Sequence, residues 1–170
     1  IEDAAHCIEG TRDGIKPGQL GDTACFSFYA TKNLTCGEGG AVITNDPEVA
    51  DRLRLLRSHG MTKTATDRER DGYSHWDMVL FGWKYNMDNI HAALLLPQLE
   101  GIDERWNNRI AVADRYTHAL EELEDVTLPS VVGNSKHAFH LYPIRVKKTL
   151  RDQLIKSFHR NGIGSTVNYR

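Results

Sequence analysis

Three glycines crowd into the stretch between two short β-prone segments, and this arrangement limits the possible folds more than any other feature of the chain. Residues 24–29 are largely aromatic and predict one strand, and residues 41–44 predict a second. Between them, Gly37, Gly39 and Gly40 favour a tight loop with positive φ angles. The pattern therefore predicts two strands joined by a loop whose backbone can approach a ligand closely.

Helical patterns follow these strands. Asp46-Pro47 predicts an N-cap and a first-turn proline for a helix that stops near Gly60. Residues 62–75 are polar and lack periodicity, so we expect an exposed loop there. Asp88 predicts the cap of a second helix, in which Pro97 should produce a kink or a local break. Alternation of strands and helices indicates an α/β fold.

The second half of the chain begins with a long helix predicted from Asp103 onward. A strand is then expected over 139–146, where Pro143 indicates an edge or a bulge. Residues 150–158 have the spacing of an amphipathic helix that Asn161-Gly162 would end. A last strand is expected over 165–169.

Composition excludes several classes of protein. The formal net charge is -2, so general attraction to nucleic acid or to an anionic membrane is not expected. The longest apolar stretch, 90–96, is too short to span a bilayer. Cys7, Cys25 and Cys36 show no CxxC spacing, which favours free thiols in a reducing cytoplasm. No HExxH or paired CxxC motif occurs, and we predict no metal site.

Four polar residues lie where chemistry is often found in α/β sheets. Asp3 and His6 follow a predicted strand end, and Ser27 and Lys32 straddle the end of the next strand. Ligands collect beyond the carboxyl ends of strands in such sheets. Each residue alone also has an ordinary structural interpretation, because a single loop lysine is usually solvated and a single aspartate near a strand end is usually a helix cap.

Six blocks of sequence, taken together and in order, resemble the DegT/DnrJ/StrS family of sugar aminotransferases. These blocks are Glu2–His6, Phe26–Leu34, Gly37–Gly40, Arg57–Gly60, Gly82–Met87, and Ala92-Ala93 with Gln98-Leu99. The resemblance implies the fold-type I architecture of pyridoxal-phosphate enzymes. Residues 1–108 would form part of the three-layer α/β/α large domain, and residues 109–170 the linking helix and most of a small α+β C-terminal domain.

The resemblance also implies a role for individual residues around a pyridoxal 5'-phosphate cofactor. Lys32 would hold the cofactor as a Schiff base and then move protons. Asp3 would pair with the protonated pyridine nitrogen and keep the ring an electron sink. His6 would lie against the ring or its hydroxyl, Ser27 would donate to the phosphate, and Asn86 would reach the phosphate of the neighbouring subunit's cofactor in a homodimer with shared active sites.

On the substrate side, the resemblance implies a keto-sugar nucleotide as amino acceptor and an amino acid, glutamate, as donor, in the biosynthesis of amino sugars for surface polysaccharides or antibiotics. His140, Asn168 and Tyr169 match positions near the sugar, although Asn168-Tyr169 stands where many members have His-Tyr. Family members carry a long segment before the Asp3 block, with the phosphate loop and the aromatic residue that stacks on the ring. We therefore expect the chain to be a piece of a longer enzyme and to bind the cofactor weakly by itself.

Two other enzyme activities and a non-catalytic role are the alternatives to aminotransfer. A dehydratase branch of the family has histidine in place of the Schiff-base lysine, so Lys32 disfavours dehydration by that route. A member acting on a cyclic polyol or an aminobenzoate precursor remains open. A non-catalytic protein that kept the fold would be expected to have lost at least one of Asp3, His6, Ser27 and Lys32.

Overall fold

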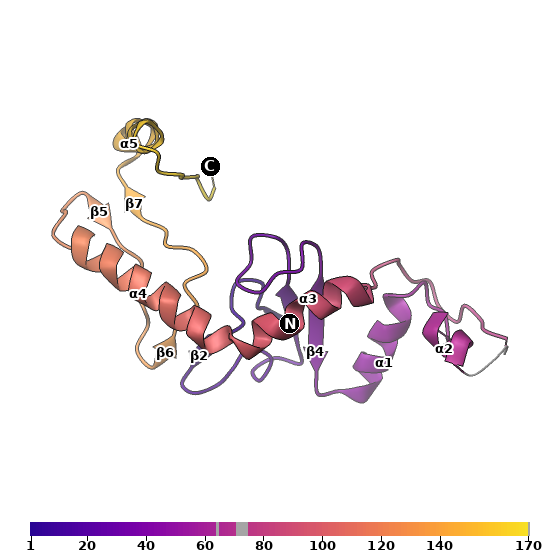
Figure 1. Ribbon diagram of the computed structural model, residues 1–170. Coiled ribbons are helices and arrows are strands. Elements are labelled where there is room, and N and C mark those ends of the chain that lie inside the picture. Colours follow the sequence, from indigo (N-terminus) through magenta and orange to yellow (C-terminus); the bar gives the residue numbers. More distant parts are fainter. Residues whose placement is uncertain (64, 71–74, 170) are drawn as a thin grey trace.

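The computed structural model describes residues 1–63, 65–70 and 75–169, and its centre is a three-stranded sheet (Figure 1). The strands are β1 (Glu2–Asp3), β3 (Thr23–Ser27) and β4 (Gly40–Thr44), in the order β1-β3-β4. β1 runs parallel to β3, and β4 runs antiparallel to it. The two strands predicted on either side of the glycine-rich stretch are thereby confirmed as neighbours in one sheet.

The glycines between β3 and β4 are needed for different physical reasons. Only Gly37 has a positive φ, of 88°, which is the backbone freedom that the sequence predicted for all three. A Cβ on Gly39 would lie 2.7 Å from both Cys36 Sγ and Met87 Sδ, and one on Gly40 would lie 2.8 Å from the Phe26 carbonyl oxygen. At these two positions glycine provides space, not a left-handed turn.

A small hydrophobic core holds the loop against helix α3 (Asn89–Glu100). Phe28, Leu34, Cys36 and Leu95 are buried together, with Leu95 coming from the helix. The Gln98 side chain adds two hydrogen bonds, because its Oε1 accepts from Thr35 N at 3.2 Å and its Nε2 donates to Thr35 O at 2.7 Å. The loop that contains Lys32 is therefore anchored at its far end.

Helix α1 (Pro47–Leu56) begins as predicted. The Asp46 carboxylate accepts hydrogen bonds from Glu48 N at 2.8 Å and Val49 N at 3.2 Å, and Pro47 occupies the first turn. The loop expected over 62–75 is wrong in part, since α2 (Ala65–Arg70) lies inside it. Residues 64 and 71–74 of that expected loop lie outside the described residues.

Of the two outcomes expected at Pro97, a kink or a local break, the break is wrong. Asp88 caps α3 by accepting from His91 N at 2.9 Å, as expected, but the helix continues through Pro97 to Glu100. Gln98 Nε2 donates to the Leu94 carbonyl oxygen at 2.6 Å, so polar groups beside the proline still find partners. The interruption falls at Gly101, after which α4 (Ile102–Leu120) confirms the predicted long helix.

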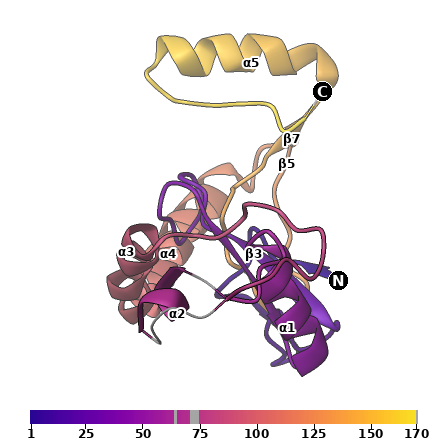
Figure 2. The same ribbon diagram turned by 90° about the vertical axis from the view of Figure 1, so that its right-hand side faces the viewer.

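The remaining elements surround α4 and extend beyond it. Two short antiparallel pairs form, β2 (Thr11–Arg12) with β6 (Ser135–Lys136), and β5 (Val126–Thr127) with β7 (Arg145–Val146). The amphipathic helix is confirmed as α5 (Lys148–Arg160), ended by Asn161. Figure 2 shows α5 lying apart from the sheet, connected through β7.

Two predicted strands near the C-terminus are wrong or shortened. Phe139 has a φ of 44°, a left-handed conformation that no strand accommodates, so only Arg145–Val146 of the expected 139–146 strand pairs. The described residues 165–169 form no strand. The prediction used local β propensity alone, whereas residues 137–140 form a loop that packs against α4.

An ion pair joins α4 to the N-terminal loop. Arg109 Nη2 donates to Glu9 Oε1, and Arg109 Nε donates to the Ala138 carbonyl oxygen at 3.1 Å. The Glu9 side chain is only 1% exposed, and that of Arg109 is 23% exposed. Because an unpaired buried carboxylate is costly, this pair fixes the position of α4 against the loop after β1.

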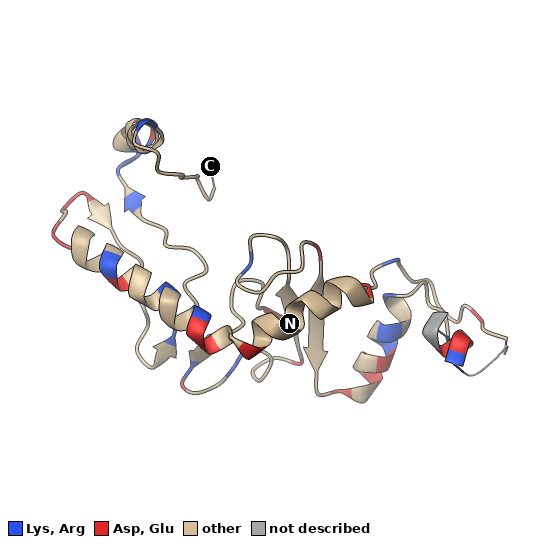
Figure 3. Cartoon of the chain, in the orientation of Figure 1, with Lys and Arg blue, Asp and Glu red and all other residues tan. Residues whose placement is uncertain are grey.

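Charge is unevenly distributed over the helices. Figure 3 shows charged residues on α1, α2 and α4, whereas α3 is nearly free of them and carries only Glu100 at its end. Ile90, Leu94 and Leu96 of α3 are 77%, 52% and 63% exposed. Among the described residues, no helix combines the length and the apolar character needed to cross a membrane.

The turn after α1 gives a first prediction. Gly60 has a φ of 73°, and a Cβ there would collide with the Leu80 carbonyl oxygen. Gly60→Ala should therefore lower the free energy of unfolding by about 2 kcal/mol, from backbone strain and overpacking together. Gly133→Ala is the matched control, because a Cβ on Gly133 meets nothing within 4 Å. Equal denaturation midpoints for the two variants would contradict this account.

The buried ion pair gives a second prediction. Arg109→Met strands the Glu9 carboxylate and should reduce the free energy of unfolding by about 3 kcal/mol. Arg54→Met removes an ion pair to Asp51 whose side chains are 68% and 75% exposed, and it should change stability by less than about 1 kcal/mol. Urea denaturation of both variants checks the contrast, and a loss as small as that of Arg54→Met would show that Glu9 tolerates isolation.

Candidate active site

The end of β3 and the turn after it bring two of the predicted residues together. β3 ends at Ser27, and Lys32 N donates to the Tyr29 carbonyl oxygen at 2.9 Å, which closes a tight turn. Both side chains line a small cavity of about 10 Å³, and His6 lines it from the loop after β1. The structure therefore brings His6, Ser27 and Lys32 to one place from separate segments of the chain.

Asp3 lies at the same edge of the sheet but outside that cavity. It ends β1 and faces Cys25 of β3 in the register of the parallel pair. Its Oδ1 accepts from Ala5 N at 3.1 Å, which shapes the turn leading to His6. Ala4 and Ala5, directly after it, do line the cavity. The carboxylate remains exposed at the strand end, with its second oxygen available to a ligand.

His140 joins this group from the other half of the chain. Its ring centroid lies 4.2 Å from that of His6, and its Nδ1 lies 2.9 Å from Asn33 Oδ1. Burial lowers the pKa of His140, and the positive charges of His6, Lys32 and Arg109 lower it further. His140 is therefore held toward the neutral imidazole form beside Lys32.

The other predicted residues lie elsewhere. Asn86 is exposed in the segment before α3, where its Oδ1 accepts from Lys84 Nζ at 2.6 Å. Asn168 and Tyr169 follow α5 and are also exposed, Tyr169 to 89%. None of the three lines the cavity around Lys32. Within this chain, the structure does not bring them to Lys32.

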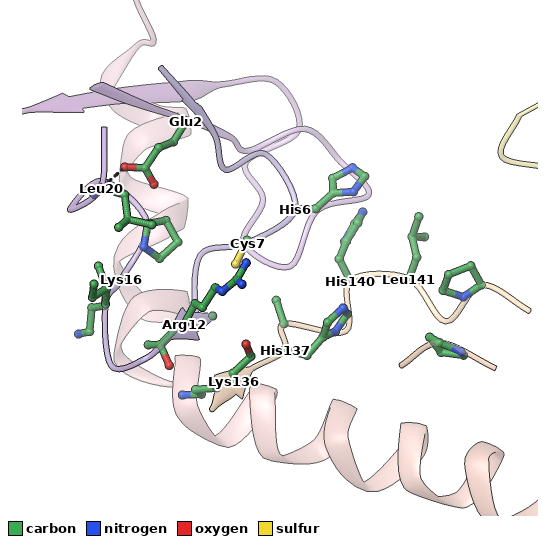
Figure 4. Close-up of a pocket in the computed structure, with 18 residues that line it drawn as sticks. Glu2, His6, Cys7, Arg12, Lys16, Leu20, Lys136, His137, His140 and Leu141 are labelled. Carbon is green, nitrogen blue, oxygen red and sulfur yellow. Dashed lines mark hydrogen bonds between the residues drawn. The ribbon is translucent and has the colours of Figure 1, made fainter. Parts of the chain in front are cut away.

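A larger cavity of about 500 Å³ adjoins this group (Figure 4). It shares His6 and Cys7 with the cavity around Lys32, and His140 also lines it. Arg12, Lys16 and Lys136 lie farther along its wall and carry positive charge. The cavity is lined by both halves of the chain.

The acidic residue in this cavity is already occupied by backbone donors. Glu2 accepts hydrogen bonds from Gly18 N at 2.9 Å, Leu20 N at 3.0 Å and Gly21 N at 2.6 Å. These bonds, with that from Gly18 first, lower the pKa of Glu2. The cavity walls therefore carry three basic side chains, of which Lys136 is already paired with Asp103 at 3.3 Å, and one carboxylate that is committed to backbone donors. This balance suits an anionic ligand.

Sequence reasoning missed three residues that hold the site together. They are Glu9, Asn33 and Arg109, which form one polar network behind Lys32. The available signals were weak: Glu9 is a single acid beside Ile8, and Asn33 is merely the neighbour of Lys32. The partner of Glu9 is 100 positions away along the chain, so local patterns could not identify it.

The cysteines and possible metal ligands provide no second site. Cys7, Cys25 and Cys36 are free thiols, and burial raises the pKa of Cys7 and of Cys36. Both thiols are therefore held in their less reactive protonated form. In the part of the chain that the structure describes, no three metal-ligating side chains converge.

Comparison with known proteins places this geometry in a family. The family model of the DegT/DnrJ/EryC1/StrS aminotransferases matches residues 1–170. The spore coat polysaccharide biosynthesis protein SpsC of Bacillus subtilis is 37% identical over 175 residues, which cover 99% of this chain and 45% of that protein. The chain spans about half the length of the curated relatives it matches.

Solved structures agree in fold. PseC of Helicobacter pylori, an aminotransferase involved in the biosynthesis of pseudoaminic acid, superposes with a TM-score of 0.88 at 29% identity, over 99% of this chain and 44% of that one. The putative sugar aminotransferase Spr1654 of Streptococcus pneumoniae in its PLP form gives 0.85 at 28% identity, over 98% and 43%. The α/β fold is thus that of pyridoxal-phosphate-dependent aminotransferases, and the chain belongs to the DegT/DnrJ/EryC1/StrS aminotransferase family.

Proposed function

We propose that the protein uses pyridoxal 5'-phosphate to transfer an amino group from glutamate to a keto-sugar nucleotide. The observation that carries this proposal is the convergence of Lys32, Ser27 and His6 on one cavity, with His140 against His6. The relatives support a sugar substrate, since SpsC is a spore coat polysaccharide biosynthesis protein and PseC an aminotransferase involved in the biosynthesis of pseudoaminic acid.

The side chains around Lys32 fit such a cofactor. Lys32 provides a primary amine for covalent attachment. The Ser27 hydroxyl accepts from Tyr29 N at 3.4 Å, which leaves its own proton free for a phosphate oxygen. His6 would lie beside the ring and Asp3 at its nitrogen. When bound, the cofactor supplies an electron sink for the carbon that loses its proton.

The residues of this chain would then handle protons and charge. Lys32 Nζ would take a proton from the α-carbon of the amino donor and later give a proton to the sugar carbon that receives the amino group. This requires a mobile and unprotonated amine. Asp3 would place its carboxylate next to the positive charge near the strand end. His140, held toward its neutral form, would face the sugar side.

The larger cavity supports the nucleotide part of the proposal. A keto-sugar nucleotide carries negatively charged phosphates, and Arg12, Lys16 and Lys136 line the same cavity as His6 and His140. The same proposal includes a homodimer in which Asn86 reaches the neighbouring subunit's cofactor, and substrate contacts by Asn168 and Tyr169. It also includes a division between residues 1–108 and 109–170 and a cytoplasmic location.

Borohydride reduction of the whole protein with pyridoxal phosphate tests the assignment of Lys32. The pyridoxyl group should be found on the Lys32 peptide by mass spectrometry, and Lys32→Ala should abolish both this label and amino transfer from glutamate to keto-sugar nucleotides. Lys156→Ala on α5 is the control and should keep both. A label on another lysine, or amine formation by Lys32→Ala, would refute the proposal.

The shared site is tested through Asn86. Asn86→Ala should weaken cofactor affinity roughly tenfold or more, because a hydrogen bond to a charged phosphate is lost. Mixed dimers of Asn86→Ala and Lys32→Ala should regain part of the activity, since one of their two sites is then intact. Dimers of Asn86→Ala alone, measured at a cofactor concentration too low to saturate them, provide the baseline. Absence of recovery in verified mixed dimers would show that each site is built within one subunit.

A further inference from the structure

Asn33 is the junction of a polar chain behind Lys32. Its Nδ2 donates to Glu9 Oε2 at 3.1 Å and to the Ala138 carbonyl oxygen at 3.5 Å. Its Oδ1 lies 2.9 Å from His140 Nδ1. The amide therefore connects the buried Glu9–Arg109 pair to the histidine that lies against His6.

The partners of Asn33 determine which way its amide points. A carbonyl oxygen only accepts hydrogen bonds, and an ionised carboxylate likewise only accepts. Glu9 is 1% exposed and its other oxygen is bound by the Arg109 guanidinium, which keeps it a paired carboxylate. The NH₂ group of Asn33 must face these two acceptors, because the reversed amide would set oxygen against oxygen twice. Asn33 Oδ1 therefore faces His140 as an acceptor.

The orientation of Asn33 decides the tautomer of His140. An amide oxygen cannot donate, so the bond between Asn33 Oδ1 and His140 Nδ1 requires the proton on Nδ1. In a neutral imidazole the other nitrogen, Nε2, then carries the lone pair. Fixing one ring nitrogen through a second residue is a common way for proteins to define what the other nitrogen does.

We propose that Glu9 and Asn33 are positioning residues that hold His140 as its Nδ1–H tautomer, so that Nε2 is presented as a hydrogen-bond acceptor in the 500 Å³ cavity. The inference rests on the proposed function, in which this cavity receives the sugar. The group recognised there is a donor, such as a hydroxyl of the keto-sugar next to the reacting carbon. A carbonyl oxygen at the same place finds no partner in Nε2.

The charges around His140 favour the neutral ring that this arrangement needs. Among the described residues, His6, Lys32 and Arg109 act on it with positive charge, and Glu9 opposes them. Burial is the largest effect, and together these influences lower the pKa of His140. The lone pair on Nε2 is thereby kept free at neutral pH, and protonation at acidic pH would convert the acceptor into a donor.

Nitrogen NMR of the whole protein, labelled with ¹⁵N-histidine and free of cofactor, tests the tautomer directly. The His140 signals are assigned from their loss in His140→Gln. At neutral pH, Nδ1 should show the shift of a protonated nitrogen and Nε2 that of a nitrogen with a lone pair. The reverse pattern, or two protonated nitrogens, would overturn the proposal.

Two variants test whether Glu9 and Asn33 cause this state. Asn33→Asp places a carboxylate beside His140, so the ring should take up its proton at a higher pH than in the parent protein, and the acidic limb of kcat/KM should move up by about one pH unit. Glu9→Gln can donate or accept, which frees the Asn33 amide to turn, so a mixture of tautomers is expected. Asn107→Asp on the exposed side of α4 is the control and should change neither reading.

The outcomes separate this proposal from the proposed function. If Glu9→Gln does not fold, Asn33→Asp still decides, and unchanged ring shifts in Asn33→Asp would refute the role of Asn33. Because the NMR measurement uses protein without cofactor, the tautomer can hold while borohydride labels another lysine. In that case the assigned activity fails and the positioning of His140 stands. If borohydride labels Lys32 but His140 shows the opposite tautomer, the proposed function stands and the positioning of His140 is refuted.

Discussion

The ion pair between Glu9 and Arg109 is the interaction on which the rest of the site depends. Burying a carboxylate costs several kcal/mol unless it is paired and hydrogen-bonded, so the N-terminal loop is stable in this position only when α4 is in place. Arg109 also binds the Ala138 carbonyl oxygen, and Glu9 binds Asn33. One buried charge thus couples the loop after β1, the Lys32 turn and the segment before His140.

This coupling explains what the sequence could and could not predict. The strands around the glycine-rich loop and the caps at Asp46 and Asp88 follow from short-range chemistry, and they were predicted correctly. The strand expected at Phe139 was wrong because contacts with α4, and not local β propensity, determine the conformation of residues 137–140. A boundary between residues 108 and 109 stays a prediction, as do the individual site roles.

The site shows the same division. The resemblance singled out Lys32, Ser27 and His6, and the structure brings those three together, but the resemblance offered no reason to single out Glu9 or Asn33. Their importance lies in partners far away along the chain. The exposed apolar side of α3 also depends on partners that the sequence does not reveal. Exposed apolar surfaces often mark interfaces, and the proposed homodimer would cover this side of α3.

The immediate adjacency of Lys32 and Asn33 has a mechanical consequence. Asn33 is tied down through its side chain to Glu9 and His140, while Lys32 carries a long stem with several rotatable bonds. The role proposed for Lys32 requires its amine to move between a bound and a released position while the residues around it keep their places. Because the side-chain contacts of Asn33 hold the neighbouring backbone, the Lys32 amine can move while its own backbone stays fixed.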